Sequence, residues 1–263
     1  MSADSIHARN NLYGFFRQPF LRGNSRVEQM IEGLLNLLLE KFGYKVSRVS
    51  GKCANEALYA LHEYLDEQGS FDYELYRKTQ EDGNKRKIDW VWAKEENISF
   101  ISSYIQNSRG TPQFGICHGT RCGREQEWFR RFLGCDVIGT EISDTAEQFP
   151  NTIQWDFHEV KPEWLGAVDF IYSNSFDHSY DPEKCLNAWM SCLKKNGLCI
   201  IEHSSLDGLN CSDELDAFGA EIATMPYLIT LWGNGCYGVR QILKAPITTP
   251  NLKFLSFIVI QRF

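Results

Sequence analysis

The chain has 263 residues, of which 43% are hydrophobic and 23% charged, a composition typical of a soluble globular protein. Its formal net charge of -7 at pH 7 argues against nucleic acid as a partner. The first eleven residues contain no apolar signal core, and residues 30–39, the most apolar stretch, are too short to span a bilayer. We therefore expect a cytoplasmic protein that makes no membrane contact.

The cysteine pattern favours free thiols. Nine cysteines, an odd number, are spread along the chain without any Cys-x-x-Cys pair, and several lie inside apolar runs. Such a pattern is typical of a reducing compartment rather than of a disulfide framework. Cys117, His118 and Cys122 are close in sequence, but their spacing matches no common zinc motif, so no metal site is predicted.

The first 110 residues are predicted to form a helical N-terminal cap. Apolar residues between positions 27 and 38 recur at i, i+3 and i+4, and residues 54–65 and 98–110 give two further helical segments. The charged stretch 80–87 is predicted to be a loop or an exposed helix. Residues 9–26 mix arginines with aromatic residues and would pack on the core or meet the substrate.

From position 111 to 263 the pattern changes to short apolar runs that alternate with helices. Predicted strands cover residues 114–117, 137–139, 152–155, 168–173 and 198–202, with a helix at 125–133. Strands that alternate with helices indicate βαβ units and a parallel sheet.

One further helix and the C-terminal tail complete the predicted elements. Asp181 is a good N-cap and Pro182 suits the first helical position. Lys194 and Lys195 are predicted to lie in the last turn, before a C-cap at Asn196 and Gly197. Residues 239–243 and 254–260 are predicted to be strands that pair antiparallel, since no helix separates them.

Three features at the ends of the first three predicted strands carry chemistry. A glycine turn at residues 119–123 precedes a helix, which lets backbone approach an anionic ligand. Glu141 follows the next strand at about the spacing that reaches ribose hydroxyls. Asp156 and Phe157 follow the third and could contact a base. The alternatives are a plain strand-to-helix turn, a solvated acid, and a helix cap beside a core aromatic.

Taken together, residues 114–205 resemble the core of the class I S-adenosylmethionine-dependent methyltransferases. Residues 117–123, Cys-His-Gly-Thr-Arg-Cys-Gly, resemble the acid-x-Gly-x-Gly-x-Gly loop of that family, and residues 193–197 resemble its Leu-x-x-x-Gly motif. The resemblance implies a doubly wound α/β fold with a mostly parallel, seven-stranded, Rossmann-like sheet. It also implies S-adenosylmethionine as methyl donor, S-adenosylhomocysteine as product, and donor-binding roles for Cys117, His118, Gly119, Arg121, Gly123, Glu141, Asp156, Phe157, Ser173 and Asn174.

Two departures from that motif matter. Cys117 replaces the acid that in this family helps to hold the amino group of the donor, and Arg121 replaces the middle glycine. Another group must then meet the amino group, and Arg121 or Arg124 could meet the methionine carboxylate.

We expect an enzyme that methylates a small molecule, and we favour an oxygen acceptor over a nitrogen acceptor. His178 is the candidate general base, because imidazole titrates near neutral pH, and Asp177 would orient it or act itself. His178 could instead pack beside the donor.

The alternative functions are a methyltransferase-like binding protein without catalysis and a nicotinamide-dependent oxidoreductase, although the glycine spacing of a dinucleotide fingerprint is missing. A possible lid lies at residues 232–237, unless these form an ordinary loop before a strand. The sequence identifies neither the acceptor nor the oligomeric state.

Overall fold

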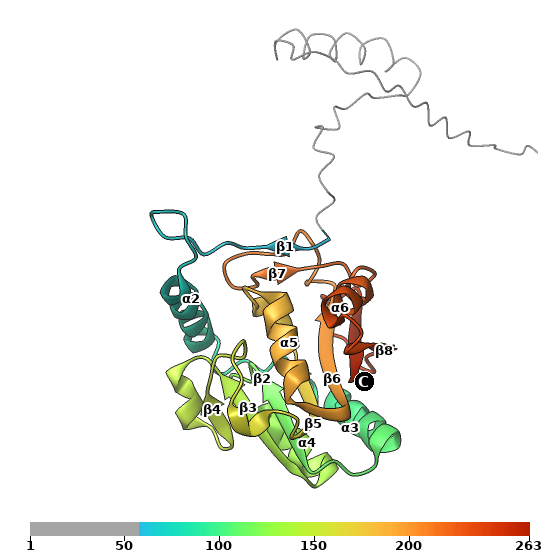
Figure 1. The fold of residues 1–263 in the computed structure, drawn as a ribbon. Helices are drawn as coiled ribbons and strands as arrows, with labels where there is room; N and C mark the ends of the chain where they lie inside the picture. The colour runs from blue at the N-terminus through green and yellow to red at the C-terminus, as the bar shows by residue number, and fades with distance from the viewer. Residues whose placement is uncertain (1–57) are drawn as a thin grey trace, which may run out of the picture. The chain divides into compact units, whose positions relative to one another are not determined.

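A seven-stranded sheet forms the centre of the computed structural model, which describes residues 58–263 (Figure 1). Its strand order is β4-β3-β2-β5-β6-β9-β8. The strands are β2 (Phe114–His118), β3 (Asp136–Glu141), β4 (Thr152–Gln154), β5 (Val168–Ser173), β6 (Leu193–Ser204), β8 (Tyr237–Lys244) and β9 (Leu255–Arg262).

The pairing of the strands confirms the predicted sheet. β2, β3, β4, β5 and β6 pair in parallel. β9 lies between β6 and β8 and is antiparallel to both. Residues 257–260 of β9 are completely buried, as their apolar side chains require. The fold is therefore the mostly parallel, doubly wound α/β fold that the sequence predicts.

Helices cover both faces of the sheet. Alternate residues of one strand point to opposite faces, so Ile116 and Cys117 of β2 enter different cores. One core holds α5 (Pro182–Cys192) and α6 (Met225–Gly233), and the other holds α3 (Glu95–Arg109) and α4 (Arg124–Leu133). The described cysteines are all free, and no described helix is both long and apolar enough to cross a membrane.

The helix that precedes β6 ends earlier than predicted. Asp181 caps α5 as expected, because its side chain accepts a hydrogen bond from the Lys184 N–H at 3.0 Å. However, α5 ends at Cys192, and the prediction that Lys194 and Lys195 occupy its last turn is wrong. Leu193 is the C-cap of α5 in place of the predicted Asn196 and Gly197, and it already pairs with Val168 of β5, so the chain enters the ladder before the lysines. The left-handed Asn196 lies where the register of that ladder shifts.

The N-terminal part differs most from the prediction. From residue 58 on, the predicted helix 54–65 is wrong: β1 (Ala60–Leu61) pairs antiparallel with β7 (Phe218–Gly219). This long-range pairing overrides the local helical pattern. Residues 80–86 belong to α2 (Tyr73–Arg86), whose inner face buries Tyr76, Gln80, Gly83 and Asn84. That stretch is therefore not simply an exposed helix.

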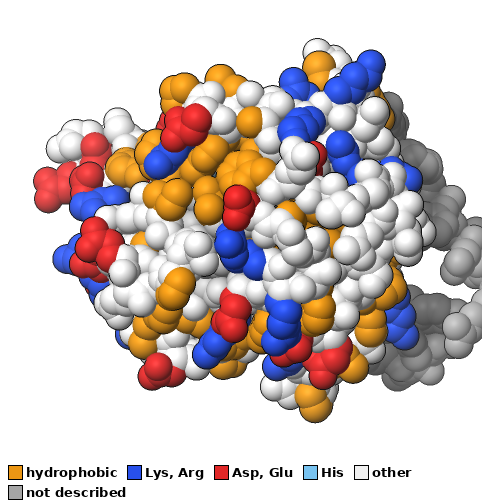
Figure 2. All heavy atoms as spheres, turned by 90° about the horizontal axis from the view of Figure 1, so that it is seen from below, with side chains coloured by type: hydrophobic (Ala, Val, Ile, Leu, Met, Phe, Trp, Pro, Cys, Tyr) orange, Lys and Arg blue, Asp and Glu red, His pale blue; other side chains and the backbone are white. Residues whose placement is uncertain are grey.

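The expected cap is only partly described. The helix predicted at 27–38 and the aromatic stretch 9–26 lie outside the described residues, so a division of the chain at residues 110 and 111 stays a prediction. Residues 58–110 belong to the same compact unit as the core. On the face shown in Figure 2, Lys and Arg side chains are interspersed with Asp and Glu over most of the surface, and several Lys and Arg side chains lie close together at the upper right.

The proposed lid at residues 232–237 is an ordinary connection. Trp232 is buried in the last turn of α6, Asn234 caps that helix in a left-handed conformation, and Tyr237 begins β8. Tyr237 pairs with Arg262 at the end of β9, which places the connection at the amino ends of the parallel strands.

Candidate active site

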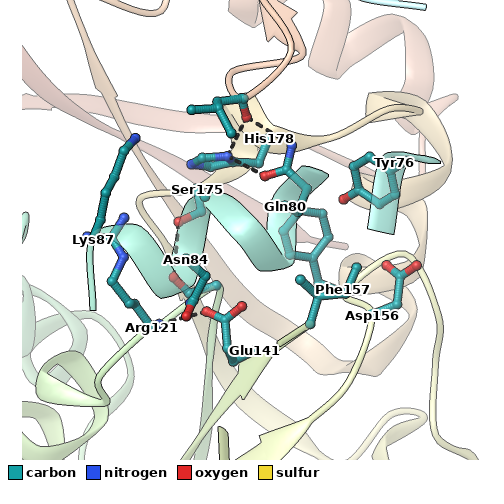
Figure 3. A pocket seen from close by; sticks show the side chains of 14 residues that line it. Tyr76, Gln80, Asn84, Lys87, Arg121, Glu141, Asp156, Phe157, Ser175 and His178 are labelled. Carbon is teal, nitrogen blue, oxygen red and sulfur yellow. Dashed lines mark hydrogen bonds between the residues drawn. The ribbon is translucent and has the colours of Figure 1, made fainter. Parts of the chain in front are cut away.

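A cavity with two adjoining lobes lies at the carboxyl ends of the parallel strands. The lobes have empty volumes of about 560 and 860 Å³, open solvent included. The α2 lobe (Figure 3) is lined by Tyr76, Gln80, Gly83, Asn84, Lys87, Gly119, Arg121, Glu141, Ile142, Asp156, Phe157, Ser175, His178 and Leu215. The tryptophan lobe is lined among others by Trp90, Trp92, Thr120, Glu125, Asn174, Asp177, Glu202, Asp207 and Asp216. Lys87, Gly119, Arg121, Ser175 and His178 line both lobes.

The glycine turn forms the wall between the lobes. Gly119 has a φ of +70°, and a Cβ there would lie 2.6 Å from the Cβ of Ser175, so only glycine fits. Arg121, which stands where the resembled motif has glycine, has a φ of +45°. Its guanidinium donates to the Trp90 carbonyl at 2.7 Å and lies 5.8 Å from the centre of the Trp90 ring. Arg121 therefore attaches the segment after α2 to the turn.

Glu141 lines the α2 lobe from the end of β3. Its carboxylate accepts hydrogen bonds from the backbone N–H of Arg121 at 2.9 Å and of Ser143 at 3.2 Å. Burial raises the pKa of Glu141, although these backbone bonds and Arg121 offset part of the effect. The carboxylate thus holds the turn in place and borders the cavity.

Asp156 and Phe157 line the same lobe, but the oxygens of Asp156 already have partners. Oδ1 accepts from the backbone N–H of His158 at 2.9 Å and from its ring at 2.7 Å, and Oδ2 accepts from the Tyr73 hydroxyl at 2.9 Å. Burial raises the pKa of Asp156, yet the bonds from His158 and Tyr73 outweigh it and leave the pKa below its usual value. Asp156 therefore holds His158 and Tyr73 in place. A contact with the methyl donor, as predicted from the sequence, would be made in addition to these bonds.

Four of the predicted donor-binding residues line neither lobe. Cys117 is fully buried in the α3–α4 core. His118 stacks on Trp189, with burial lowering its pKa to about 3, and Ser173 donates to the His118 carbonyl at 3.0 Å. Gly123 lines a separate surface hollow at the start of α4. These four residues support the cavity wall without lining it, and a direct contact between them and the donor stays a prediction.

Asn174 and Glu125 meet in the tryptophan lobe. The Asn174 amide donates to Glu125 Oε1 at 3.1 Å. Glu125 lies at the start of α4 and is 5% exposed, and its Oε2 is buried without a hydrogen-bond partner among the described residues. Burial raises the pKa of Glu125 to about 7.

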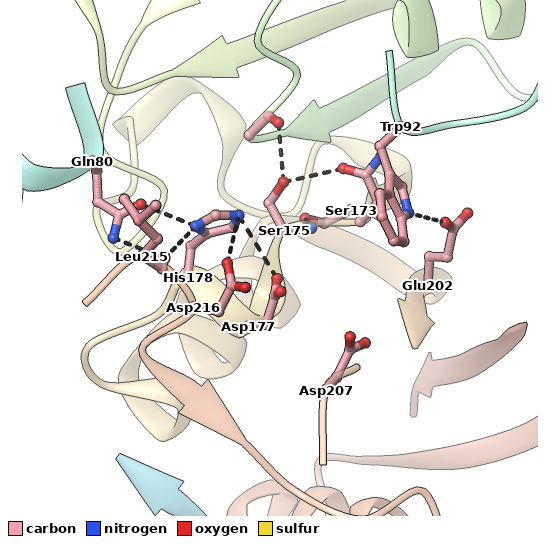
Figure 4. Close-up of polar contacts among 12 residues, drawn as sticks. Gln80, Trp92, Ser173, Ser175, Asp177, His178, Glu202, Asp207, Leu215 and Asp216 are labelled. Atoms are coloured by element: carbon pink, nitrogen blue, oxygen red, sulfur yellow. Dashed lines mark hydrogen bonds and ion pairs between the residues drawn. The ribbon is translucent and has the colours of Figure 1, made fainter. Parts of the chain in front are cut away.

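His178 lies at the junction of the lobes, in the short 3₁₀ helix η4 (Phe176–His178) that follows β5. Its Nδ1 lies 2.6 Å from the Leu215 carbonyl and 3.0 Å from Gln80 Oε1, and both of these oxygens can only accept (Figure 4). We therefore assign the neutral ring's proton to Nδ1, which leaves the Nε2 lone pair free. Burial lowers the pKa of His178, and Asp216 offsets part of this shift.

Two carboxylates face the free nitrogen of His178, and a third lies farther away. Nε2 lies 3.8 Å from Asp216 Oδ1 and 4.0 Å from Asp177 Oδ1, whereas Asp207 lies apart from this group (Figure 4). Burial and the neighbouring acids raise the pKa of Asp177 strongly, and burial raises that of Asp207 to about 6. The ligand atoms of Asp177, His178 and Asp216 lie within 4.8 Å of one another, a spacing compatible with a cation as well as with a protonated imidazole.

Several lining residues were missed from the sequence. Tyr76, Gln80 and Asn84 recur every four residues, which places them on one face of α2, but their polarity hid that periodicity. Trp92 donates to Glu202 at 2.7 Å across a separation of 110 residues, and Leu215 reaches His178 from a loop. No local pattern indicates contacts of that range.

Comparisons with known proteins agree on the fold. No protein-family model matches the chain, and no curated protein matches it in sequence. Among solved structures, the chain is similar to the 1,6-didemethyltoxoflavin-N1-methyltransferase of Burkholderia thailandensis, determined with 1,6-didemethyltoxoflavin and S-adenosylhomocysteine bound. The TM-score is 0.55 at 14% identity, over 77% of this chain and 98% of that one.

Two further structures show the same likeness. The plantazolicin methyltransferase BpumL, in complex with a triazolic desmethylPZN analogue and S-adenosylhomocysteine, gives a TM-score of 0.56 at 16% identity, over 72% of this chain and 97% of that one. The mitomycin 7-O-methyltransferase MmcR gives 0.53 at 12% identity, over 72% of this chain and 60% of that one. At such identities, the likeness shows a shared fold.

Proposed function

We propose that this chain, whose fold is that of the class I S-adenosylmethionine-dependent methyltransferases, transfers a methyl group from S-adenosylmethionine to a small-molecule acceptor. The observation that carries the proposal is the junction of the glycine turn with Glu141. Gly119 admits no side chain, and the Arg121 N–H is fixed by a buried carboxylate that borders the same cavity. The proteins with this fold described above include N- and O-methyltransferases of small molecules.

The residues that line the α2 lobe fit the adenosine end of such a donor. Glu141 offers carboxylate oxygens to ribose hydroxyls, and the Phe157 ring offers an apolar surface to the base. The methionine end would extend past Gly119 toward Asn174 in the tryptophan lobe. The adenosine would then lie beside the residues at or after the ends of β3 and β4, and the methionine end beside the residues that follow β5.

We further propose oxygen as the acceptor atom and His178 as the general base. The bound donor supplies a sulfonium methyl group that is already activated for in-line displacement. Leu215 and Gln80 fix the imidazole so that Nε2 would take the hydroxyl proton of the acceptor while the acceptor oxygen bonds to the methyl carbon. The bond from that carbon to sulfur would break, with S-adenosylhomocysteine as the leaving group. The Asp216 carboxylate then stabilises the imidazolium, and Asp177, whose raised pKa keeps it neutral, helps to orient the ring.

Incubation of the purified protein with donor labelled in its methyl group, together with a metabolite extract, tests the proposal. We expect label to leave the donor and appear in the small-molecule fraction, and not in added RNA. The His178→Ala variant serves as the matched control and should transfer little. A folded protein that binds S-adenosylhomocysteine but transfers no label to any fraction would instead support a binding protein without catalysis.

A further inference from the structure

Glu125 is a buried acid whose charge the described residues compensate only in part, through the Asn174 amide and the positive charge of Arg121. It is 5% exposed, and no Lys or Arg among residues 58–263 forms an ion pair with it. The Asn174 amide bonds to Oε1, whereas Oε2 has no partner and is buried. A buried carboxylate with a free oxygen is unfavourable unless a cation or a hydrogen-bond donor meets it.

The position of Glu125 indicates which ligand group it would meet. Glu125, Asn174 and Gly119 line the same lobe, so Glu125 borders the space between the glycine turn and the end of β5. That space is where the proposed function places the methionine end of the donor. The donor carries two positive groups there, its sulfonium and its α-ammonium, and only the ammonium has N–H groups that can bond to a carboxylate oxygen.

The other acids nearby are less suited to this role. Glu202, the other buried carboxylate of the lobe, already accepts from Trp92 Nε1 at 2.7 Å and from the Tyr172 hydroxyl at 2.8 Å. Asp207 is bonded to Ser204. Cys117, at the end of β2, presents a buried neutral thiol, since burial raises its pKa. Glu125 is thus the buried acid of this lobe that keeps a free oxygen.

We propose that Glu125 binds the α-ammonium group of the donor, with Asn174 holding the carboxylate in position. The inference rests on the proposed function, because it assumes an adenosyl amino acid as ligand. It assigns the recognition of the amino group to a residue of α4 rather than to the strand end, where Cys117 stands.

Calorimetric titration with two ligands tests the assignment. S-adenosylhomocysteine has the ammonium group, and S-adenosyl-4-thiobutyrate lacks only that group. We expect Glu125→Gln to weaken S-adenosylhomocysteine binding by about tenfold to a hundredfold, as for loss of a charged hydrogen bond. Binding of the thiobutyrate analogue should change by less than about threefold, because no ammonium is lost from its contacts. Glu127→Gln, on the exposed side of the same helix, is the matched control and should leave both affinities unchanged.

A second readout uses the wild-type protein and covers the case in which Glu125→Gln fails to fold. Because the carboxyl group of the free protein titrates near 7, ammonium binding should drive off its proton. Titrations near about pH 6.5 in two buffers of different ionisation enthalpy should show proton release with S-adenosylhomocysteine and none with the analogue.

Three results would overturn the assignment: an equal loss for both ligands in Glu125→Gln, no loss for either, or equal proton release with both ligands in the wild type. Failure of the proposed function looks different: without a donor site the wild-type protein would bind neither ligand, and without catalysis it would bind S-adenosylhomocysteine but transfer no label.

Discussion

The role of His178 gives the most demanding prediction. His178→Ala removes the proposed general base from the junction of the lobes, so turnover should fall by about 10²–10⁴. Stability should change little, because Gln80 Nε2 also donates to the Leu215 carbonyl at 3.0 Å and keeps it satisfied. Donor affinity should stay nearly intact. The matched control is His62→Ala, since His62 lines neither lobe.

The pH profile separates a base from a positioning group. A base works in its neutral form, and burial lowers the pKa of His178, so kcat/KM should rise with pH to a plateau, with a midpoint below about 6.5. Asp216 raises this pKa, so Asp216→Asn should move the midpoint lower. The shift should be at most about 0.7 pH unit, because a partly exposed ion pair contributes only about 0.2–1 kcal/mol.

Rates are best followed by S-adenosylhomocysteine release under initial-rate conditions. Full turnover of His178→Ala with an unchanged pH profile would refute the reasoning. If His178→Ala instead raised the KM for the acceptor and kept the rise of kcat/KM with pH, His178 would be a residue that positions the acceptor and not a base.

Three further predictions concern the donor site. Gly119→Ala adds a Cβ that would lie 2.6 Å from that of Ser175, so calorimetry should show at least about a tenfold loss of S-adenosylhomocysteine affinity; affinity within twofold of wild type would contradict this. Glu141→Ala should lose about 1–3 kcal/mol of the same binding energy, and unchanged affinity in a folded variant would remove Glu141 from the site. Asp156→Asn should lower the melting temperature of the ligand-free protein, because an amide offers the His158 ring fewer acceptors. Since the folded pKa of Asp156 lies below its usual value, its stabilisation is present above about pH 4 and is lost on acidification, so the two melting curves should converge at low pH. A constant difference in melting temperature would exclude the ionised carboxylate as its source.

Local patterns were sufficient for the sheet and its turns. Apolar strands, the Asp181 cap and the glycine turn each depend on residues within a few positions of one another. Arg121 adopts the left-handed conformation at the position where the resembled loop has glycine, so the backbone of the predicted turn is kept although the residue differs. The antiparallel tail follows equally from the absence of a helix between its two strands.

The cavity could be predicted only in part. Glu141, Asn174 and His178 lie at strand ends, where the fold rule places ligands, and all three border a lobe. The opposite wall comes from α2 and from the loop that carries Leu215 and Asp216: Gln80 contacts His178 across 98 residues, and Leu215 contacts it across 37. For Asp156, the position at a strand end was predicted correctly. Its hydrogen bonds with Tyr73 and His158 could not be predicted from the sequence.

Titration of the purified protein with S-adenosylhomocysteine tests the central claim most directly. The account predicts a single site with a dissociation constant in the micromolar range or below, or about -8 kcal/mol. Gly119→Ala should weaken that binding. A folded wild-type protein that gives no binding heat with millimolar ligand would contradict the claim that this cavity is a methyl-donor site.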